Sequence, residues 1–165
     1  MAKNSEKRLA TSQRKKWLQK LQPSDARPSR GDETSPSIVI DSNVWYSAIV
    51  FGKKPEEAID YCLENAIIQT SAILINEVID RLHHKAAAPY RFRHQLRSRL
   101  ERICEVHEIT NPPAVVRDPD DNQVIATALK SRSSYIITGD EDLLVLGPYK
   151  GIGIVKPADF LKLVS

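Results

Sequence analysis

Short runs of apolar residues, many of them β-branched, recur along the chain and are separated by segments whose apolar residues follow a helical spacing. Runs of this length, bounded by polar residues and glycines, predict short buried strands. The predicted strands lie at 38–40, 66–70, 106–109, 135–138 and 152–155. Their spacing leaves room for at least one helix between most neighbouring strands.

The intervening segments carry residues that begin, continue and end helices. Ser71 is of a type that caps helix N-termini, and an apolar stripe from Ile75 to Leu82 follows it at i, i+3, i+4, i+7 spacing. Pro55 suits a first helical turn, and Gly52 suits a helix end. We predict helices at 7–21, 44–50, 55–65, after Ser71, at 89–103, after Asp121 as N-cap, at 142–146 and from Pro157 onward.

This alternation favours an α/β fold with a central, mostly parallel, doubly wound sheet and helices on both faces. We expect it to occupy residues 37–165 as one domain, which is long enough for a substantial core. Residues 1–36 differ, because a basic, loosely periodic stretch is followed there by one rich in proline, serine and charge. We predict that they form a basic, flexible leader containing a short helix.

The composition, with 41% apolar and 27% charged residues, is typical of a soluble globular protein. No apolar run approaches the 18 or more residues that span a bilayer, and the N-terminus lacks the apolar stretch of a secretory signal. Cys62 and Cys104 form no pairing motif, which favours reduced thiols and a cytoplasmic location. Residues 1–35 hold nine basic and four acidic groups, so the net charge of +3 comes from the leader.

Four short acidic segments lie where strands and helices meet. Asp41 directly follows one predicted strand, and Asp140 lies two residues beyond Thr138 at the end of another. Asp121 opens the helix that leads into that second strand, and Glu77 lies between apolar neighbours in a predicted helix. In open α/β sheets, ligands bind at the carboxyl ends of the strands, where the strand order reverses. The acids therefore become candidates for one shared site.

Carboxylates gathered at one edge repel one another. Two unit charges 4 Å apart cost about 4 kcal/mol at an effective dielectric constant near 20, so the cluster calls for a cation. Each acid also has a simpler interpretation. Asp121 and Asp140 are good helix caps, and Asp118-Pro-Asp120 is typical of a turn. Capping explains each acid singly but not their shared placement, so metal-dependent hydrolysis is the leading hypothesis.

Five motifs, in their order and spacing, resemble the PIN-domain nucleases, and most closely the PIN-family toxins of bacterial type II toxin–antitoxin systems. The motifs are IVIDSNVWYSAIVFG (38–52), SAILINEVIDRL (71–82), RDPDDNQVIATAL (117–129), YIITGDEDLLVLG (135–147) and GIGIVKPADFL (151–161). The resemblance covers residues 37–165. It implies a PIN-like, three-layer α/β/α fold and a ribonuclease that cleaves single-stranded RNA with the help of a metal ion. The basic leader is not part of the common pattern.

The resemblance also implies roles for individual residues. The catalytic and metal-binding residues would be Asp41, Glu77, Asp121 and Asp140, with Asp142 as a substitute or partner for Asp140. Asn43 and Thr138 match polar positions that orient these acids. One or two Mg²⁺ or Mn²⁺ ions would bind between the carboxylates. The resemblance further implies an antitoxin protein as partner and a homodimer, which many relatives form.

Basic residues are concentrated between positions 81 and 102. We predict that Arg91, Arg93 and Arg97 bind RNA, with Tyr90 and Phe92 available for base stacking. The same segment also fits a solvated helix whose Phe92 side packs on the core, or a contact with an acidic antitoxin segment. Two other functions stay open: an RNA-processing nuclease without an antitoxin, and a non-catalytic RNA- or protein-binding module.

Overall fold

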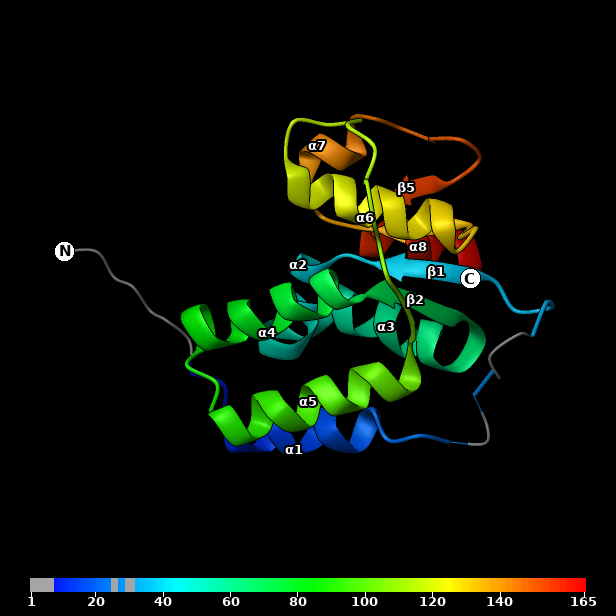
Figure 1. The fold of residues 1–165 in the computed structure, drawn as a ribbon. Coiled ribbons are helices and arrows are strands. Elements are labelled where there is room, and N and C mark those ends of the chain that lie inside the picture. Colours follow the sequence, from blue (N-terminus) through cyan, green and yellow to red (C-terminus); the bar gives the residue numbers. More distant parts are fainter. Residues whose placement is uncertain (1–7, 25–26, 29–31) are drawn as a thin grey trace.

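The computed structural model describes residues 8–24, 27–28 and 32–165 (Figure 1), so parts of the predicted leader and linker lie outside the described residues. Within them, five strands form one sheet with helices on both faces, which confirms the predicted α/β fold class. The strands are β1 (Ser37–Ile40), β2 (Ile67–Ser71), β3 (Glu105–His107), β4 (Tyr135–Ile137) and β5 (Gly153–Val155). Every neighbouring pair is parallel.

The strand order β3-β2-β1-β4-β5 places the first strand in the middle of the sheet. The chain builds outward from β1 through β2 to β3, and then continues on the other side of β1 with β4 and β5. The order therefore reverses between β1 and β4, whose carboxyl ends lie side by side because Ile40 pairs with Ile137. This is the edge at which an open α/β sheet binds ligands.

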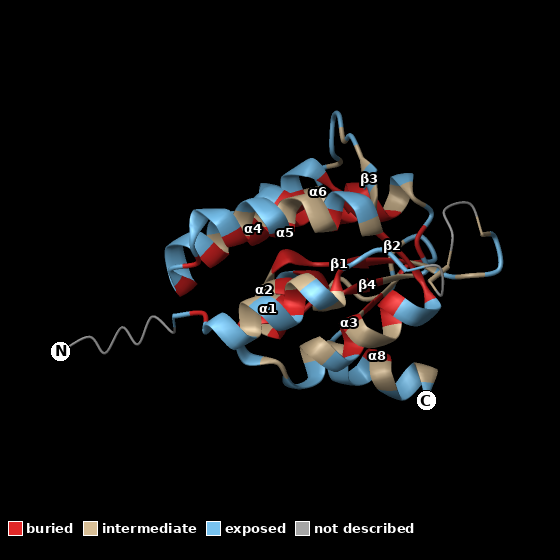
Figure 2. Cartoon of the chain, turned by 90° about the horizontal axis from the view of Figure 1, so that it is seen from below, coloured by how far each residue is buried: buried red, intermediate tan, exposed pale blue. Residues whose placement is uncertain are grey.

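Side chains of the central strand alternate between the two faces of the sheet. Ile38 and Ile40 belong to one hydrophobic cluster, whereas Val39 belongs to another. The first cluster includes residues of α2 (Ser42–Phe51), α3 (Lys53–Asn65), α4 (Ala72–Ala86), α5 (Tyr90–Ile103) and α8 (Pro157–Val164). The second includes residues of α6 (Pro119–Lys130) and α7 (Glu141–Leu144). Figure 2 shows β1 and the inward sides of the flanking helices buried.

The N-terminal segment contributes a further helix, α1 (Thr11–Lys20), as the sequence predicts. Trp17 is fully buried in the first cluster and meets Trp45 of α2 edge to face, with ring centroids 6.5 Å apart. Ahead of the helix, the backbone N–H of Leu9 donates to the carbonyl oxygen of Ala86 at 3.1 Å. The helix is therefore packed on the domain through both side chains and backbone.

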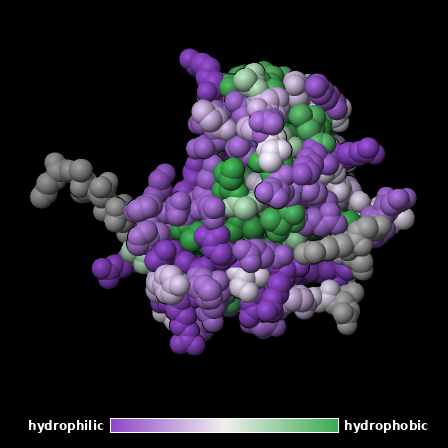
Figure 3. Space-filling view, in the orientation of Figure 1, coloured by the Kyte–Doolittle hydropathy of each residue, from purple (hydrophilic) through white to green (hydrophobic). Residues whose placement is uncertain are grey.

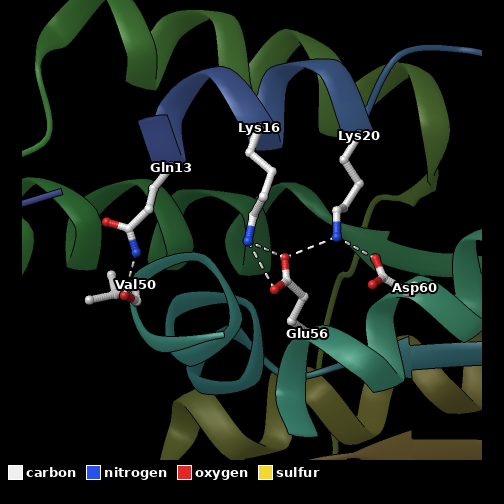
Figure 4. A network of polar contacts seen from close by, with 6 residues as sticks. All are labelled: Gln13, Lys16, Lys20, Val50, Glu56 and Asp60. Carbon is white, nitrogen blue, oxygen red and sulfur yellow. Dashed lines mark hydrogen bonds and ion pairs between the residues drawn. The ribbon is translucent and has the colours of Figure 1, made fainter. Parts of the chain in front are cut away.

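Ion pairs fasten the polar side of α1 to α3 (Figure 4). Lys16 and Lys20 share one carboxylate oxygen of Glu56 at 2.9 Å, and Lys20 also reaches Asp60 at 2.6 Å. Burial alone would lower the pKa of the Lys20 amine. The hydrogen bonds and negative charges of Asp60 and Glu56 outweigh burial, so this pKa is raised. Helix α1 therefore shares the hydrophobic core and the ion pairs of the domain. The domain boundary predicted at residue 37 stays a prediction.

Several helices begin a few residues away from the predicted positions, and α6 and α3 show the reasons most clearly. Helix α6 begins at Pro119 and is capped by Asp118, which accepts a backbone hydrogen bond at 2.9 Å. The prediction that Asp121 caps this helix is wrong, because proline suits the first helical position and the cap precedes it. Helix α3 begins at Lys53 rather than Pro55. Proline is tolerated in this first turn because the N–H groups there have no partner within the helix. Among the described residues, no helix has the length and apolar character needed to cross a membrane.

Candidate active site

Three carboxylates converge where the chain leaves β4. Asp121 lies in the first turn of α6, Asp140 caps the short helix α7, and Asp142 lies in the first turn of α7. One oxygen from each lies within 4.8 Å of the others. The carboxylate of Asp140 also accepts the backbone N–H of Asp142 at 2.9 Å. Asp140 and its predicted alternative, Asp142, therefore lie in the same cluster.

Asp41 lies directly after β1 and is buried, with 4% of its surface exposed. Its backbone N–H donates to the carbonyl oxygen of Ile137 at 2.9 Å, so it extends the pairing of β1 with β4. One carboxylate oxygen accepts the N–H of Ser42 at 2.7 Å, and the other accepts the hydroxyl of Thr138 at 2.7 Å. The same hydroxyl accepts the backbone N–H of Asp140 at 3.0 Å. This arrangement supports the orienting role predicted for Thr138.

Glu77 approaches from α4, the helix that Ser71 caps. Its Oε2 accepts the hydroxyl of Ser42 at 2.9 Å, while its Oε1 is buried without a hydrogen-bond partner among the described residues. Asp41 and Glu77 do not belong to the group of three oxygens within 4.8 Å. The structure thus brings three of the five predicted acids into one cluster and holds the other two beside it through Thr138 and Ser42.

Burial and mutual repulsion raise the pKa values of these acids. Burial raises the pKa of Glu77 to about 7, and the charges of Asp120 and Asp41 act in the same direction. Burial also raises the pKa of Asp121 to about 7, together with its hydrogen bond and repulsion with Asp140. For Asp41, burial raises the pKa against the two hydrogen bonds that its carboxylate accepts. Acids that resist ionisation in this way gain most from a nearby cation.

The donor atoms fit a hard divalent cation. They are carboxylate oxygens, the ligands that suit Mg²⁺ and Mn²⁺. Asp121 Oδ2 and Glu77 Oε1 are both buried without a hydrogen-bond partner among the described residues, although buried polar atoms are seldom left in that state. A cation held between the carboxylates would partner such oxygens and relieve the repulsion. The residues present therefore fit the predicted metal.

Arg81 and Asn43 act on the acidic site in different ways. Burial has the larger influence on the pKa values of Asp41 and Glu77, and the charge of Arg81 works against it. Asn43 instead orients the loop before Asp140, because its Oδ1 accepts the backbone N–H of Gly139 at 3.5 Å. Arg81 therefore lies within electrostatic range of the site, and Asn43 contacts the backbone of the loop that leads to Asp140.

Two of the three arginines predicted to bind RNA already have partners on the protein. Arg97 donates to Asn76 Oδ1 on α4 at 2.5 Å. Arg93 donates to a backbone oxygen at 3.0 Å, and its guanidinium lies 5.7 Å from the ring centroid of Tyr90. Arg91 is exposed. Their arrangement leaves Arg91 as the arginine of the three that projects most freely into solvent.

The two aromatic residues predicted to stack on bases have opposite environments. Tyr90 is 72% exposed and is stacked with His94, with ring centroids 6.0 Å apart. Phe92 is buried with Leu96 and Leu100 in the core, so the predicted stacking role is wrong for Phe92. The helical period explains this, because residues at i, i+4 and i+8 share one face.

Two polar residues of the site were not predicted from the sequence. Ser42 holds Glu77, as described above, and its only sequence signal is its position after Asp41 at the start of a helix. Asn122 is buried, and its Oδ1 accepts the backbone N–H groups of Val115 at 3.0 Å and Val116 at 2.9 Å. The signal that could have identified Asn122 is its position on the inner side of a predicted helix, directly after the candidate metal ligand Asp121.

Comparison with protein families accounts for this geometry. A family model described as a PIN domain matches residues 37–142, which is more than half of the chain. The chain belongs to the PIN-domain family. Membership in that family suggests a metal-dependent nuclease, and the cluster of Asp121, Asp140 and Asp142 fits such an activity. No curated protein matches the chain significantly.

Proposed function

We propose that this PIN-domain protein is an endoribonuclease that cleaves single-stranded RNA with Mg²⁺ or Mn²⁺. The observation that carries the proposal is the cluster of Asp121, Asp140 and Asp142 at the point where the strand order reverses. Caps and turns do not require three carboxylates to converge, nor do they leave a buried oxygen of Asp121 without a partner. Metal binding accounts for both features.

Each acid then has a defined task. Asp121, Asp140 and Asp142 would hold one or two ions, and Thr138 would keep the carboxylate of Asp41 turned toward them. A bound divalent ion supplies positive charge at the phosphate and lowers the pKa of the attacking water. Glu77, whose pKa is raised to about 7, can accept a proton near neutral pH at Oε1, which has no hydrogen-bond partner among the described residues.

The RNA would approach across α4 and α5. Arg81 lies within electrostatic range of the acids and can offset the repulsion between them and a phosphate. Exposed Arg91 and Tyr90 provide a backbone contact and a stacking surface farther along. Figure 3 shows that the surface over α5 is mostly hydrophilic, as contact with a polyanion requires.

We further propose that the protein is a cytoplasmic toxin neutralised by an antitoxin, acting as a monomer or a homodimer. The motif resemblance supports this assignment, and the exposed Arg91 at the start of α5 offers a contact for an acidic antitoxin segment. Expression without a partner should then arrest growth, and a small neighbouring gene should rescue it. Growth unaffected by expression of an active nuclease would instead support an RNA-processing role.

Cleavage of a labelled single-stranded RNA tests the nuclease directly. We expect cleavage with Mn²⁺, none with EDTA, and a loss of at least about a hundredfold for Asp41→Asn, since charge-stabilising groups of this kind contribute about that much. Asp159→Asn on α8 is a matched control, because Asp159 is an exposed acid on a helix that packs on α3, in the hydrophobic cluster on the other face of the sheet from α6 and α7. Activity that persists in EDTA, or that Asp41→Asn leaves intact, would refute the metal mechanism.

A further inference from the structure

A pocket opens beside the three-carboxylate cluster, between α7 and the loop that precedes α6. Its volume is about 470 Å³, within the roughly 300–1,000 Å³ of ligand pockets. The lining residues are Ala114, Val115, Val116, Arg117, Asp142 and Val145. Asp142 belongs both to this pocket and to the cluster, so the pocket is continuous with the proposed active site.

The lining is apolar except at two positions. Val145 is 78% exposed, and it faces the same pocket as Ala114 and the two valines of the loop. Arg117 adds hydrogen-bond donors, and Asp142 adds negative charge on the side of the cluster. The carboxylate of Asp142 offsets the charge of Arg117, so the pocket offers a phosphate no net positive charge, whereas a flat, uncharged ring can lie against the valines. The pocket therefore suits a nucleobase rather than the RNA backbone.

The loop that forms one wall is held in place before any ligand binds. Asn122 Oδ1 accepts the N–H groups of Val115 and Val116, and Asn122 Nδ2 donates to the carbonyl oxygen of Val116 at 2.9 Å. Asn122 directly follows Asp121, so one turn of α6 fixes both a candidate ligand and the pocket wall. A wall fixed in this way loses little conformational freedom on binding, which favours affinity and selectivity.

We propose that this pocket binds the base of the nucleotide next to the cleaved phosphodiester, and that Arg117 selects guanine. The proposal rests on the proposed nuclease function. Guanine presents two acceptors, N7 and O6, on one edge, and these match the paired donors of a guanidinium. Because Asp142 joins the pocket to the cluster, a base held against Val145 keeps its own phosphate near the carboxylates.

The test combines cleavage and binding. Cleavage sites are mapped on a random-sequence RNA with Mn²⁺, and affinities for short guanine- and uracil-containing RNAs are measured by fluorescence anisotropy in the Asp41→Asn background. We expect guanine to be enriched at one position flanking the cut. Ala114→Trp, which fills the pocket, and Val145→Ser should weaken binding of the guanine RNA about tenfold, and Arg117→Lys should remove the guanine preference while keeping the charge.

Val106→Ser is the matched control, because Val106 is also an exposed valine but lies on β3, at the opposite edge of the sheet from β5. It should leave the mapped sites and affinities unchanged. A guanine preference that survives both Ala114→Trp and Arg117→Lys overturns the proposal, as does wild-type cleavage with no preference or with preference for another base. Absence of any metal-dependent cleavage would instead refute the proposed function, and the binding data would still report on the pocket.

Discussion

The hydroxyl of Thr138 links the ends of the two strands that carry the site, and its loss should weaken metal binding. It donates to Asp41 and accepts from the backbone of Asp140. Thr138→Val keeps the shape but leaves both groups without this partner, which costs about 1–3 kcal/mol of stability. We expect Mn²⁺ affinity, measured by titration calorimetry, to fall about tenfold or more, as for other residues that orient metal ligands.

Thr127→Val provides the matched control for that substitution. Thr127 is also fully buried, but its hydroxyl donates to the carbonyl oxygen of Gln123 within the same helix. Removing that contact leaves no candidate ligand without support, so Mn²⁺ affinity should stay at the wild-type value. Equal losses of affinity in both variants would show that Thr138 acts only through general stability.

The raised pKa of Glu77 should make the stability of the metal-free protein depend on pH. Burial brings this pKa to about 7, compared with 4.5 for an ordinary glutamate. Between these two values the folded metal-free protein binds more protons than the unfolded chain, so its free energy of unfolding should fall as the pH rises. Glu77→Gln should flatten this decline between pH 5 and 7, measured by urea denaturation in EDTA. A slope unchanged by the substitution would show that Glu77 is ionised in that range.

At the scale of helices and strands, local patterns predicted most of the fold. The β-branched run before Asp41 and the stripe after Ser71 each correspond to an observed element. The start of α6 is a case in which two residues of one type competed for one role. Asp118 and Asp121 could both cap α6, and the intervening Pro119 decided for Asp118. Such choices depend on backbone geometry, which residue type alone does not specify.

Helix α1 gives the clearest prediction at this scale. Trp17 is fully buried against α2 and contacts Trp45, so Trp17→Ala should lower the free energy of unfolding by about 3–5 kcal/mol. Lys15→Ala, at an exposed position of the same helix, should change it by less than about 0.5 kcal/mol. Both values follow from denaturant titrations. A Trp17→Ala protein as stable as the control would support a domain that begins at residue 37.

For the whole molecule, the sheet topology accounts for what the sequence could not place. Asp41 and Asp140 are far apart in the chain, and the parallel pairing of β1 with β4 brings their backbones together. The motif resemblance implies which acids belong to the site, and that assignment stays a prediction. The resemblance left Asp142 as a substitute or partner for Asp140, and the turn of a four-residue helix places both of them in one group with Asp121.

With the proposed metal bound, that topology should also make global stability depend on the ion. Folding forces carboxylates together that are far apart in the unfolded chain, so an ion that binds only the folded state stabilises it by RT ln(1 + [L]/Kd). At a hundredfold excess over Kd this amounts to about 2.7 kcal/mol. For a chain of this length the melting temperature should rise by about 5–10 °C.

Thermal unfolding with Mn²⁺, and then with excess EDTA, measures this effect. NaCl at matched ionic strength separates specific binding from screening, because screening acts on all exposed charges. Asp140→Asn should abolish the Mn²⁺-dependent rise while raising the melting temperature of the metal-free protein, since it removes one of the mutually repelling charges around Asp121. An equal rise with NaCl, or a Mn²⁺-dependent rise that persists in Asp140→Asn, would place the stabilising ion outside the cluster. The opposite signs expected for the two conditions distinguish a metal centre from a set of helix caps, because asparagine caps a helix about as well as aspartate and a capping role alone would leave both melting temperatures nearly unchanged.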